Sequence, residues 1–511
     1  MEAAGFFVFK AVSMGFLGNA RSLYDDSKKQ YSLVSQATCP KIEIKHYDGN
    51  SLKTAVLISG LSSGSKSGLN IDTLQSYSFS RGIDDTEGSF TVRLKDRMSG
   101  GVNVFDSIEN FDIVEITESV NRKNGAKPDF VGVIHSVKIS SSIGSDGKVR
   151  KEISVSGKSA ISLFSGCFMN LGKVGTSLYS TAAANLKIKN TFTEVEKDSS
   201  GKIVYKAQTL RKIVQNVWND FKTYLSSYVS DVSTTSVLGI MNALGMSDFS
   251  SVEDLPHIMP VSTDLYNAES VSFMDMIRKI IPEGAYQIFS KDDVSLTVKE
   301  CPFSPEEWKG LGNGSDVNLN LLTGYDFEKT DKEVYTVFMS LVEGSSIDGN
   351  YIANLQADEN GLISVASNKE KIKKYGYKPL TVSFMGYVQN RAVKTDFDRQ
   401  TFEELNSKLK SWYDNLDEML AGRIKMVNAY EDAENVPRIG EKIVFSLFAP
   451  KIQETAFYIK SETHSWSYGA SPMVEYSVER GAIYKSDGSF QGAAEKFSTA
   501  LETALENKAD S

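Results

Sequence analysis

The residues best suited to acid–base or nucleophilic chemistry are few in this 511-residue chain and lie far apart in it. The four histidines are His46, His135, His257 and His464, and the three cysteines are Cys39, Cys167 and Cys301. The sequence contains no HExxH, GxSxG or CxxC motif and no other paired metal-ligand spacing. A Cys–His hydrolase needs a cysteine at a helix start, whereas Cys301 precedes Pro302 in an expected loop and Cys167 follows Gly166. The sequence therefore predicts no catalytic residue, no metal site and no cofactor.

Two of the histidines lie in expected strands. His135 stands between Val133 and Val137, which places it on the apolar face of its strand, and His464 lies two residues from Trp466. A lone histidine in a strand usually has a structural role, so we expect both to be structural. The tryptophans are also expected mostly in the core; they are Trp218, Trp308, Trp412 and Trp466.

One stretch resembles a phosphate-binding loop. The expected strand Thr54–Ser59 is followed by Gly60–Ser67, but Ser65 takes the place of the glycine that must precede the lysine. No helical pattern follows, so a flexible hairpin loop is the preferred interpretation. Asp84-Asp85 and Asp292-Asp293 lie in expected turns, where aspartate is common because it hydrogen-bonds locally. The basic cluster Lys369–Lys374 is interpreted as a solvated helix end.

Length and charge limit the possible classes. A chain of 511 residues is too long for one core, so three to five domains are expected. The net charge of −9 argues against a general nucleic-acid-binding protein. Scattered cysteines indicate synthesis in a reducing compartment. The apolar stretch Ala3–Leu17 is interrupted by Lys10 and follows Glu2 rather than a basic region, so it predicts a terminal segment that packs on a partner rather than a signal peptide or a membrane span.

The strand pattern repeats in two distant segments. Between Phe111 and Gly157, three apolar runs separated by turn residues predict a three-stranded antiparallel meander, with Val131, Val133, Val137 and Ile139 on one face of its middle strand. The segment Pro437–Gly481 has the same plan. Two such segments in one chain predict two similar antiparallel β-barrels.

Other segments predict the elements around these barrels. Asp48-Gly49-Asn50 is a hairpin signal between two strands in Lys41–Ile58, and Leu74–Arg81 and Ser89–Lys95 are further strands. Helices are expected at Thr209–Val229, after a capping Ser272, and at Phe402–Ile424, where leucines recur every three or four residues. A last helix is expected within Gln491–Asn507. The predicted fold is therefore α+β and mainly β, with two β-barrels and smaller α/β and helical modules.

These patterns divide the chain into seven predicted parts. They are an N-terminal apolar extension (1–38), a first barrel (39–166), a helical insertion (167–255), a small α/β module (256–320), extended segments that begin the second barrel (321–396), a helix with the second barrel (397–484), and a C-terminal linker with a docking helix (485–511).

Several stretches, taken in order, resemble the family of phage tail baseplate hub proteins. Lys371–Leu380 (KIKKYGYKPL) resembles the family's YG-R/K-P stretch, and Ser272–Trp308 resembles its α/β module. Arg438–Gly481 is similar to its closing barrel, whose last strand ends in Arg-Gly, and the strands from Phe130 to Gly157 are similar to its first barrel. Together these stretches cover about two-thirds of the chain.

The resemblance implies a structural hub, not an enzyme, of a contractile-tail phage or a related injection machine. Such hubs are homotrimers in which two tube-like barrels per chain form a pseudo-six-fold ring. The implied partners are the tail tube protein, the central spike, the tape-measure protein and other baseplate proteins, with DNA passing through the ring without specific binding. The implied location is the virion tail, assembled in the bacterial cytoplasm.

Three segments are additional to the family pattern: Met1–Gln36, much of Lys187–Asp254, and the tail after Gly481. We expect the two apolar ends to contact other tail proteins, with the N-terminus facing the tape-measure protein or the channel. The candidate interaction residues are Phe6, Phe7, Phe9, Phe16, Leu17, Phe497, Leu501 and Leu505. Two alternatives remain open, namely a tail-associated cell-wall hydrolase and a carbohydrate- or receptor-binding β-module.

Overall fold

The computed structural model describes part of the chain. The described residues are 40–59, 69–71, 73–83, 85–96, 98–99, 102–118, 127–143, 145, 147, 149–169, 193–197, 199–201, 203–207, 209–226, 236–254, 271–281, 284–311, 315–316, 321–343, 365–385, 395–427, 437–446, 454–484 and 490–492.

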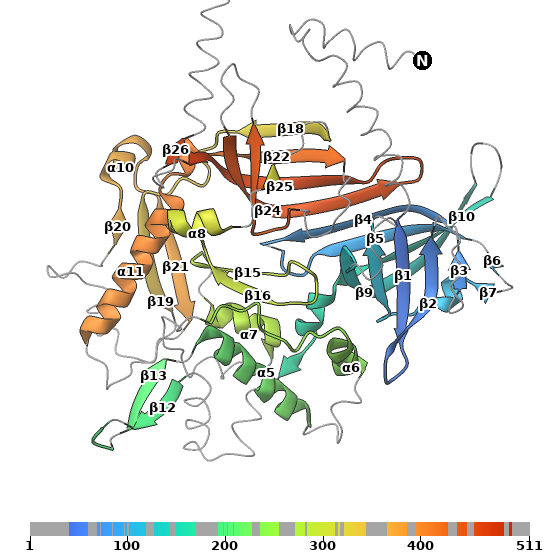
Figure 1. Cartoon of the computed structure of the whole chain (residues 1–511), viewed down its shortest axis with the longest axis horizontal. Helices are drawn as coiled ribbons and strands as arrows, with labels where there is room; N and C mark the ends of the chain where they lie inside the picture. Colours follow the sequence, from blue (N-terminus) through green and yellow to red (C-terminus); the bar gives the residue numbers. More distant parts are fainter. Residues whose placement is uncertain are drawn as a thin grey trace, which may run out of the picture.

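One large sheet forms the frame of the molecule and contains 15 strands of the described chain. Eight come from its first part: β1 Lys41–Tyr47, β2 Leu52–Ser59, β3 Leu69–Ile71, β4 Leu74–Gly82, β5 Ser89–Lys95, β8 Ile113–Thr117, β9 Phe130–Ile143 and β10 Val149–Ser159. Seven come from its last part: β17 Ser315–Asp316, β18 Leu322–Glu328, β22 Leu420–Val427, β23 Lys442–Ser446, β24 Glu454–Ser467, β25 Met473–Tyr484 and β26 Phe490–Gly492. The strand order is β18-β22-β25-β24-β4-β5-β10-β9-β8-β1-β2-β3, so the sheet runs from the red strands to the blue ones in Figure 1.

The sheet contains the same five-strand unit twice. In the first unit, the order β4-β5-β10-β9-β8 is antiparallel throughout. In the second unit, the order β18-β22-β25-β24-β23 is antiparallel in the same way. The meander strands have 5, 14 and 11 residues in the first unit and 5, 14 and 12 in the second. The repeat predicted from the sequence is therefore confirmed as a repeat of strand order and length.

The two units also match residue by residue. The ladders between β4 and β5 and between β18 and β22 each contain one bulge, after Leu74 and after Leu322. Counting along the ladders from these bulges makes Tyr77 equivalent to Tyr325. Phe79 is equivalent to Phe327 by the same count. Because a bulge fixes the register of the residues that follow it, the shared bulge shows that the units have the same internal register.

Each β unit has its own apolar core. In the first unit, inward residues such as Phe79, Phe90 and Phe130 are fully buried. In the second unit, Phe457, Tyr476 and Ile424 are equally buried. These residues alternate along their strands with polar ones, as expected for a sheet with one apolar face.

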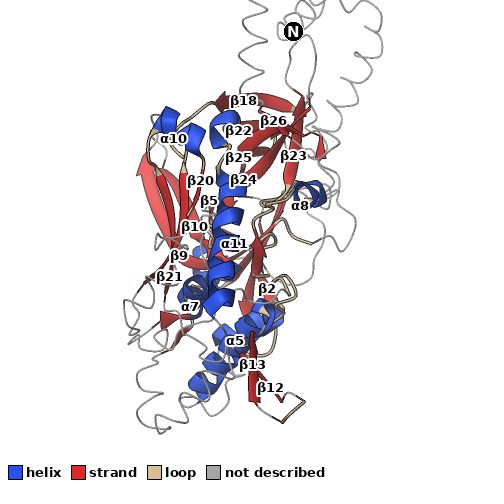
Figure 2. Ribbon diagram, turned by 90° about the vertical axis from the view of Figure 1, so that its left-hand side faces the viewer, coloured by secondary structure: helices blue, strands red, loops and turns tan. Residues whose placement is uncertain are grey.

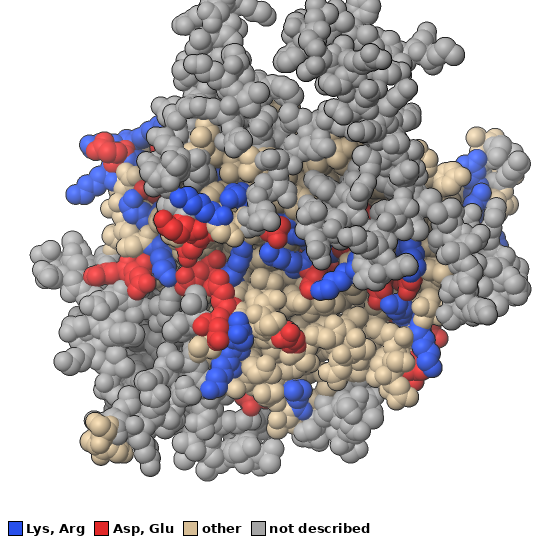
Figure 3. Space-filling view, viewed as in Figure 1, with Lys and Arg blue, Asp and Glu red and all other residues tan. Residues whose placement is uncertain are grey.

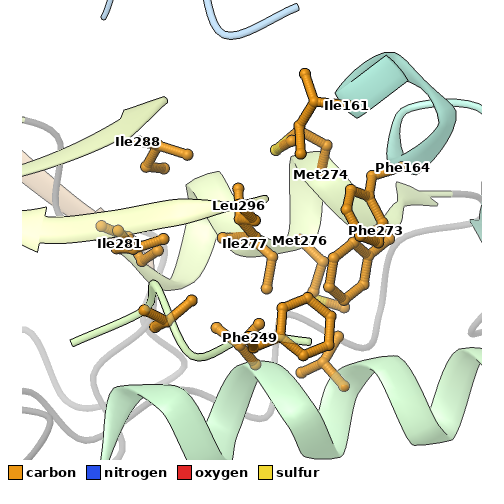
Figure 4. Packing of buried hydrophobic residues seen from close by; sticks show 14 of the residues in the cluster. Ile161, Phe164, Phe249, Phe273, Met274, Met276, Ile277, Ile281, Ile288 and Leu296 are labelled. Atoms are coloured by element: carbon orange, nitrogen blue, oxygen red, sulfur yellow. The ribbon is translucent and has the colours of Figure 1, made fainter. Parts of the chain in front are cut away.

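A third core lies beneath the first unit and combines helices with short strand pairs (Figure 1). Its elements are the 3-10 helix η2 Ala160–Phe164, α5 Leu210–Ser226, α6 Ser236–Ala243, α7 Phe273–Ile280 and the strand pairs β11 Phe168–Met169 with β14 Val271–Ser272 and β15 Tyr286–Phe289 with β16 Thr297–Glu300. Figure 4 shows Phe164, Phe249 and Phe273 packed together in this core. Their rings are tilted against one another, with centroids 5.0–6.0 Å apart. Ser272 caps α7 as predicted, since its Oγ accepts a hydrogen bond of 3.0 Å from the amide of Asp275.

A small three-stranded sheet, β20-β19-β21, borders this core and the second unit. It contains β19 Val337–Glu343, β20 Ala366–Ser367 and β21 Pro379–Met385, and it is flanked by α10 Lys369–Tyr375 and α11 Thr395–Tyr413 (Figure 2). The remaining elements are β6 Met98–Ser99, β7 Val102–Asn103, η1 Phe105–Ser107, β12 Thr193–Lys197, β13 Ile203–Ala207, α8 Pro305–Gly310 and η5 Leu416–Glu418.

The Arg-Gly pair that ends the motif of the second barrel fixes α11 to β25. The guanidinium carbon of Arg480 lies 3.5 Å from the centroid of the Trp412 ring, and Nη1 donates to the carbonyl of Trp412. A Cβ on Gly481 would overlap the ring of Phe457, so only glycine fits there. The two residues therefore have separate packing roles.

The structure corrects two expectations about helices in the last part of the chain. The helix expected at Phe402–Ile424 ends at Tyr413, and Leu420 begins strand β22. The leucine spacing continued the helical pattern past Tyr413, but β22 instead pairs on both sides, with β18 and β25. Tertiary pairing here outweighs the local helical preference. At the C-terminus, the start of the helix expected within Gln491–Asn507 is instead strand β26, and residues 493–507 lie outside the described part.

The structure also corrects the prediction of which residues face the core in the middle strand of the first meander. The ladder between β9 and β10 skips His135, which is a bulge residue with an exposed side chain. The bulge reverses the alternation beyond it. Val131 and Val133 are buried as predicted, but Ile134 is also buried and Ile139 is exposed. His135 therefore does not lie on the apolar face.

The sequence also predicted two β-barrels, whose closure the described residues do not show. The mainly β, α+β class is confirmed, but the ladders of the described residues form an open path that runs through both units. The path continues from one unit to the other because β24 pairs with β4.

Candidate functional site at the junction of the two units

The junction between the units is an antiparallel ladder of seven residue pairs between β4 and β24, running from Ser461 opposite Gly82 to Ser467 opposite Ser76. Aromatic side chains face the core from both strands. The rings of His464 and Phe79 stack at a centroid distance of 4.5 Å, and those of Trp466 and Tyr77 at 6.0 Å. The junction is thus both hydrogen-bonded and packed.

Arg81 lies at the centre of a buried ionic cluster below this ladder. Its Nε donates to Asp293 Oδ1 at 2.7 Å and its Nη2 donates to Asp293 Oδ2 at 2.5 Å. Its Nη1 donates to Glu462 Oε1 at 2.5 Å, and Nη2 also reaches the carbonyl oxygen of Asp129. These partners come from both β units and from the turn between β15 and β16. One side chain therefore connects three parts of the chain.

The position of Asp293 depends on an unusual backbone conformation. Its φ is +66°, in the left-handed region, which aspartate tolerates better than most residues. Oδ2 also accepts a hydrogen bond of 2.9 Å from the amide of Val131. Asp292 makes the local turn bonds expected from the sequence, to the amides of Val294 and Ser295. Both aspartates lie in the turn, as predicted. Asp292 makes the local hydrogen bonds, whereas Asp293 bonds across the molecule.

A second chain of polar contacts extends the cluster. Arg438 Nη1 donates to Glu462 Oε1 at 3.2 Å, and its Nη2 lies 3.4 Å from Asp129 Oδ1. Glu118 receives a hydrogen bond of 3.0 Å from the hydroxyl of Tyr77 and lies 2.8 Å from His464 Nδ1. His464 is therefore structural, as predicted.

The cluster contains two arginines and four carboxylates, all nearly fully buried except Arg438, whose side chain is 15% exposed. Burial by itself would raise the pKa of Glu462, but Arg438 and Arg81 overcome this effect and hold the pKa below its ordinary value. Burial opposes the charge of Arg81, but Asp293 and Glu462 raise its pKa above the ordinary range. Pairing therefore favours the charged forms of Glu462 and Arg81, whereas burial raises the pKa of Asp293.

Several side chains of the described residues that could act as nucleophiles or bases are buried. Cys167 and Cys301 are buried, and burial raises the pKa of both thiols to about 12, which keeps them protonated at neutral pH. Burial also lowers the pKa of Lys299 to about 8, but this amine donates to the carbonyl of Gly440 at 2.8 Å between aromatic rings. Within the described ranges there is no group of three or more side chains that could hold a metal ion.

The predicted interaction residues are not placed by the structure. Phe6, Phe7, Phe9, Phe16, Leu17, Phe497, Leu501 and Leu505 all lie outside the described residues. Cys39, His257 and the phosphate-loop lookalike at Gly60–Ser67 also lie outside them. All four tryptophans are buried as expected. Among the helices that the structure describes, none is long and apolar enough to cross a membrane.

Arg81 and Glu462 were missed in the sequence, although a signal for each exists. Arg81 continues the inward alternation of Tyr77 and Phe79, and Glu462 precedes His464 and Trp466 by the same two-residue steps. A charged residue at an inward strand position requires a buried partner. That rule would have selected both residues, though not the partner contributed by Asp293.

Charged groups on the surface are mixed. On the face shown in Figure 3, lysine and arginine side chains alternate with aspartate and glutamate, and neither sign forms one large area among the described residues. At Lys369–Lys374, Lys371 is buried and paired with Asp417, while Lys373 and Lys374 are exposed. The basic cluster is therefore partly an ion-pair anchor for α10.

Comparisons with known proteins give structural neighbours. No protein-family model matches the sequence, and no curated protein is similar to it in sequence. The 43 kDa tail protein of prophage MuSo2 from Shewanella oneidensis is similar in structure, with 9% identity, a TM-score of 0.43, and coverage of 86% of this chain and 98% of that one. The tail protein of Neisseria meningitidis MC58 has 10% identity, a TM-score of 0.45, and coverage of 86% and 96%.

A third neighbour is an Escherichia coli protein described as a component of the type VI secretion system with structural similarity to the T4 bacteriophage tail proteins gp27 and gp5. It has 10% identity and a TM-score of 0.35, with coverage of 83% of this chain and 76% of that one.

Proposed function

We propose that this chain is a structural subunit of a phage tail baseplate hub, or of the equivalent part of a related injection machine. In this role three copies form a ring that adapts the six-fold tail tube to a three-fold spike. The observation that carries the proposal is the repeat of one five-strand unit, in the same order and register, within a single chain. Three copies supply six equivalent units, which is the number that a six-fold tube requires.

The junction supports this role because it holds the two units of one chain in a fixed relation. Arg81 fixes β4 to Glu462 of β24 and to Asp293 of the α/β module, all within the buried interior. Removing one member would leave buried charges without a partner, which is costly. A docking ring benefits from such rigidity, because two units that swing independently could not present a regular surface.

In this proposal the partners are other copies of this chain, the tube protein, the spike, the tape-measure protein and neighbouring baseplate proteins. The chain acts without a cofactor and without catalysis, and DNA passes through the ring without specific contacts. The place of action is the virion tail.

The test is the mass of the purified protein in solution, measured by light scattering, followed by mixing with tube and spike proteins. A mass three times that of the 56.3 kDa chain, and co-elution with both proteins, is the expected result. A monomer that binds neither protein and cleaves cell-wall material would contradict the proposal and favour a hydrolase. A monomer that binds glycans would favour a receptor-binding module.

A further inference from the structure

Within the part of the chain that the structure describes, two strand edges at opposite ends of the repeat are paired on one side only. Among the described residues, β18 pairs only with β22, and the stretch of β9 from Ser136 to Ile143 pairs only with β10. The hairpin of β9 and β10 also carries exposed apolar side chains, with Ile139 41%, Ile143 76% and Val149 62% exposed. Open edges with apolar side chains are sites where another strand can add.

The repeat identifies what each open edge is equivalent to. The ladder between β9 and β10 skips His135, and the ladder between β24 and β25 skips Lys460, so these bulge residues correspond. Ser136 of β9 is then equivalent to Ser461 of β24. In the second unit, the stretch that begins at Ser461 is not open, because β4 of the first unit pairs with it.

The partner strand at the junction has its own equivalent. β4 corresponds to β18 through the shared bulge and the pairs Tyr77/Tyr325 and Phe79/Phe327. The contact between β24 and β4 inside the chain therefore corresponds to a contact between β9 and β18. These two strands do not pair with each other within the chain that the structure describes.

We infer that the open edge of β9 pairs with β18 of a second copy of this chain, in the register of the internal junction. This inference deepens the proposed ring and rests on the proposed function for the number of copies. Transferring the register of the β24–β4 ladder gives the pairs Lys138 with Glu328, Ile139 with Phe327, Ser140 with Asp326, and Ser141 with Tyr325.

The transferred register brings compatible side chains together, although it was fixed by backbone pairing alone. Lys138 and Glu328 carry opposite charges and are both exposed in the single chain. Ile139 meets Phe327 on the core-facing side, where His464 meets Phe79 in the junction. Opposite charges and apolar pairs directly across a ladder are both stabilising. A one-residue slip would place Lys138 opposite Phe327 and separate both pairs.

The contact is head-to-tail, because β9 of each copy pairs with β18 of the next copy. Contacts of this kind form closed rings when the rotation between copies closes, and filaments when it does not. The Arg81–Glu462 ion pair has no counterpart here, because Val137 and Lys329 occupy the equivalent positions. The contact between copies therefore depends on different side chains from the junction.

Paired cysteines test the register. Directly opposed residues have Cα atoms about 4.5–5.5 Å apart, which a disulfide spans. In a Cys39→Ser background, Ser140→Cys combined with Asp326→Cys should give covalent oligomers under mild oxidation. The matched control combines Ser141→Cys with Asp326→Cys, which places the two thiols on opposite faces of the sheet. At least tenfold less cross-linked product is expected from the control.

A charge exchange tests the pairing without cysteines. Lys138→Glu alone and Glu328→Lys alone should each weaken self-association roughly two- to fivefold per contact, the range expected for a directly opposed charge pair. The double variant should restore it. Equal amounts of cross-linked product from the in-register and the control cysteine pair would overturn the pairing. So would a double charge variant that self-associates more weakly than either single variant.

The mass of the wild-type chain separates this inference from the proposed function. A trimer without in-register cross-linking or charge rescue would overturn the β9–β18 contact and leave the hub proposal standing. In-register cross-linking in assemblies that do not stop at three copies would support the contact and overturn the trimeric ring. A monomer at every concentration, without cross-linking, would overturn the contact.

Discussion

Arg81 and Asp293 lie 212 residues apart in the sequence, yet two hydrogen bonds of 2.7 and 2.5 Å join the guanidinium group to the carboxylate. Both side chains are almost completely buried. The free energy of unfolding should therefore depend strongly on this one contact.

Arg81→Ala should lower the free energy of unfolding by about 3–5 kcal/mol, because it leaves Asp293 and Glu462 as buried charges without Arg81. Urea denaturation followed by tryptophan fluorescence measures the change. Arg93→Ala is the matched control on the neighbouring strand, where a half-exposed ion pair with Glu152 contributes about 1 kcal/mol or less. Equal losses in the two variants would contradict a central role for the cluster.

Acid should weaken the cluster through Glu462. Arg438 and Arg81 outweigh the opposing effect of burial and hold the pKa of Glu462 below its ordinary value of 4.5. A carboxylate with a lowered pKa stabilises the fold above its unfolded pKa, and this contribution is lost as the pH falls through the folded pKa. The stability difference between wild type and Glu462→Gln should be constant from pH 7 to 5 and shrink below about pH 4.5. Urea midpoints across this range measure it; a difference that grows on acidification would contradict the assignment.

The bulge in the first meander should not tolerate a side chain at Gly157. A Cβ there would overlap the carbonyl oxygen of Val133 and approach the ring of Phe90. Gly157→Ala should therefore cost about 1–3 kcal/mol of stability through overpacking. Gly310→Ala is the control, since a Cβ at that position meets nothing within 4 Å. Thermal unfolding of Gly157→Ala and Gly310→Ala measures the difference in stability. Similar melting temperatures of the two variants would show that the bulge can accommodate a Cβ atom.

Deletion of Met1–Asn19 tests the role of the apolar N-terminus. If this segment contacts the tape-measure protein or the channel, the shortened chain should fold and form trimers but assemble poorly with other tail proteins. Circular dichroism, light scattering and co-purification separate the three properties. Loss of folding would show that the segment belongs to the core of this chain instead.

Local patterns predicted the elements of the β units well. Alternating apolar residues and turn signals located both meanders, and Asp48-Gly49-Asn50 located the first hairpin, where Gly49 has a φ of +96°. These features depend on neighbouring residues only. The sequence was misleading where tertiary pairing decided the outcome, as at Leu420, which continues a helical spacing but begins strand β22.

The junction could not be predicted in the same way. The pairing of β4 with β24 joins residues almost 400 positions apart, and no local signal selects that partner. Asp293 lies in a turn like many other aspartates, and only its left-handed backbone and the approach of Arg81 distinguish it. Long-range contacts of this kind depend on the whole fold.

The ladder between β4 and β24 also has a mechanical consequence. A force that slides the two units past each other along the strand direction loads all seven residue pairs at once, whereas a force that peels the sheet open breaks them one at a time. The ladder therefore resists shear along the strands better than it resists peeling. A tail that transmits thrust along the strands of its ring would use the sheet in its strongest direction.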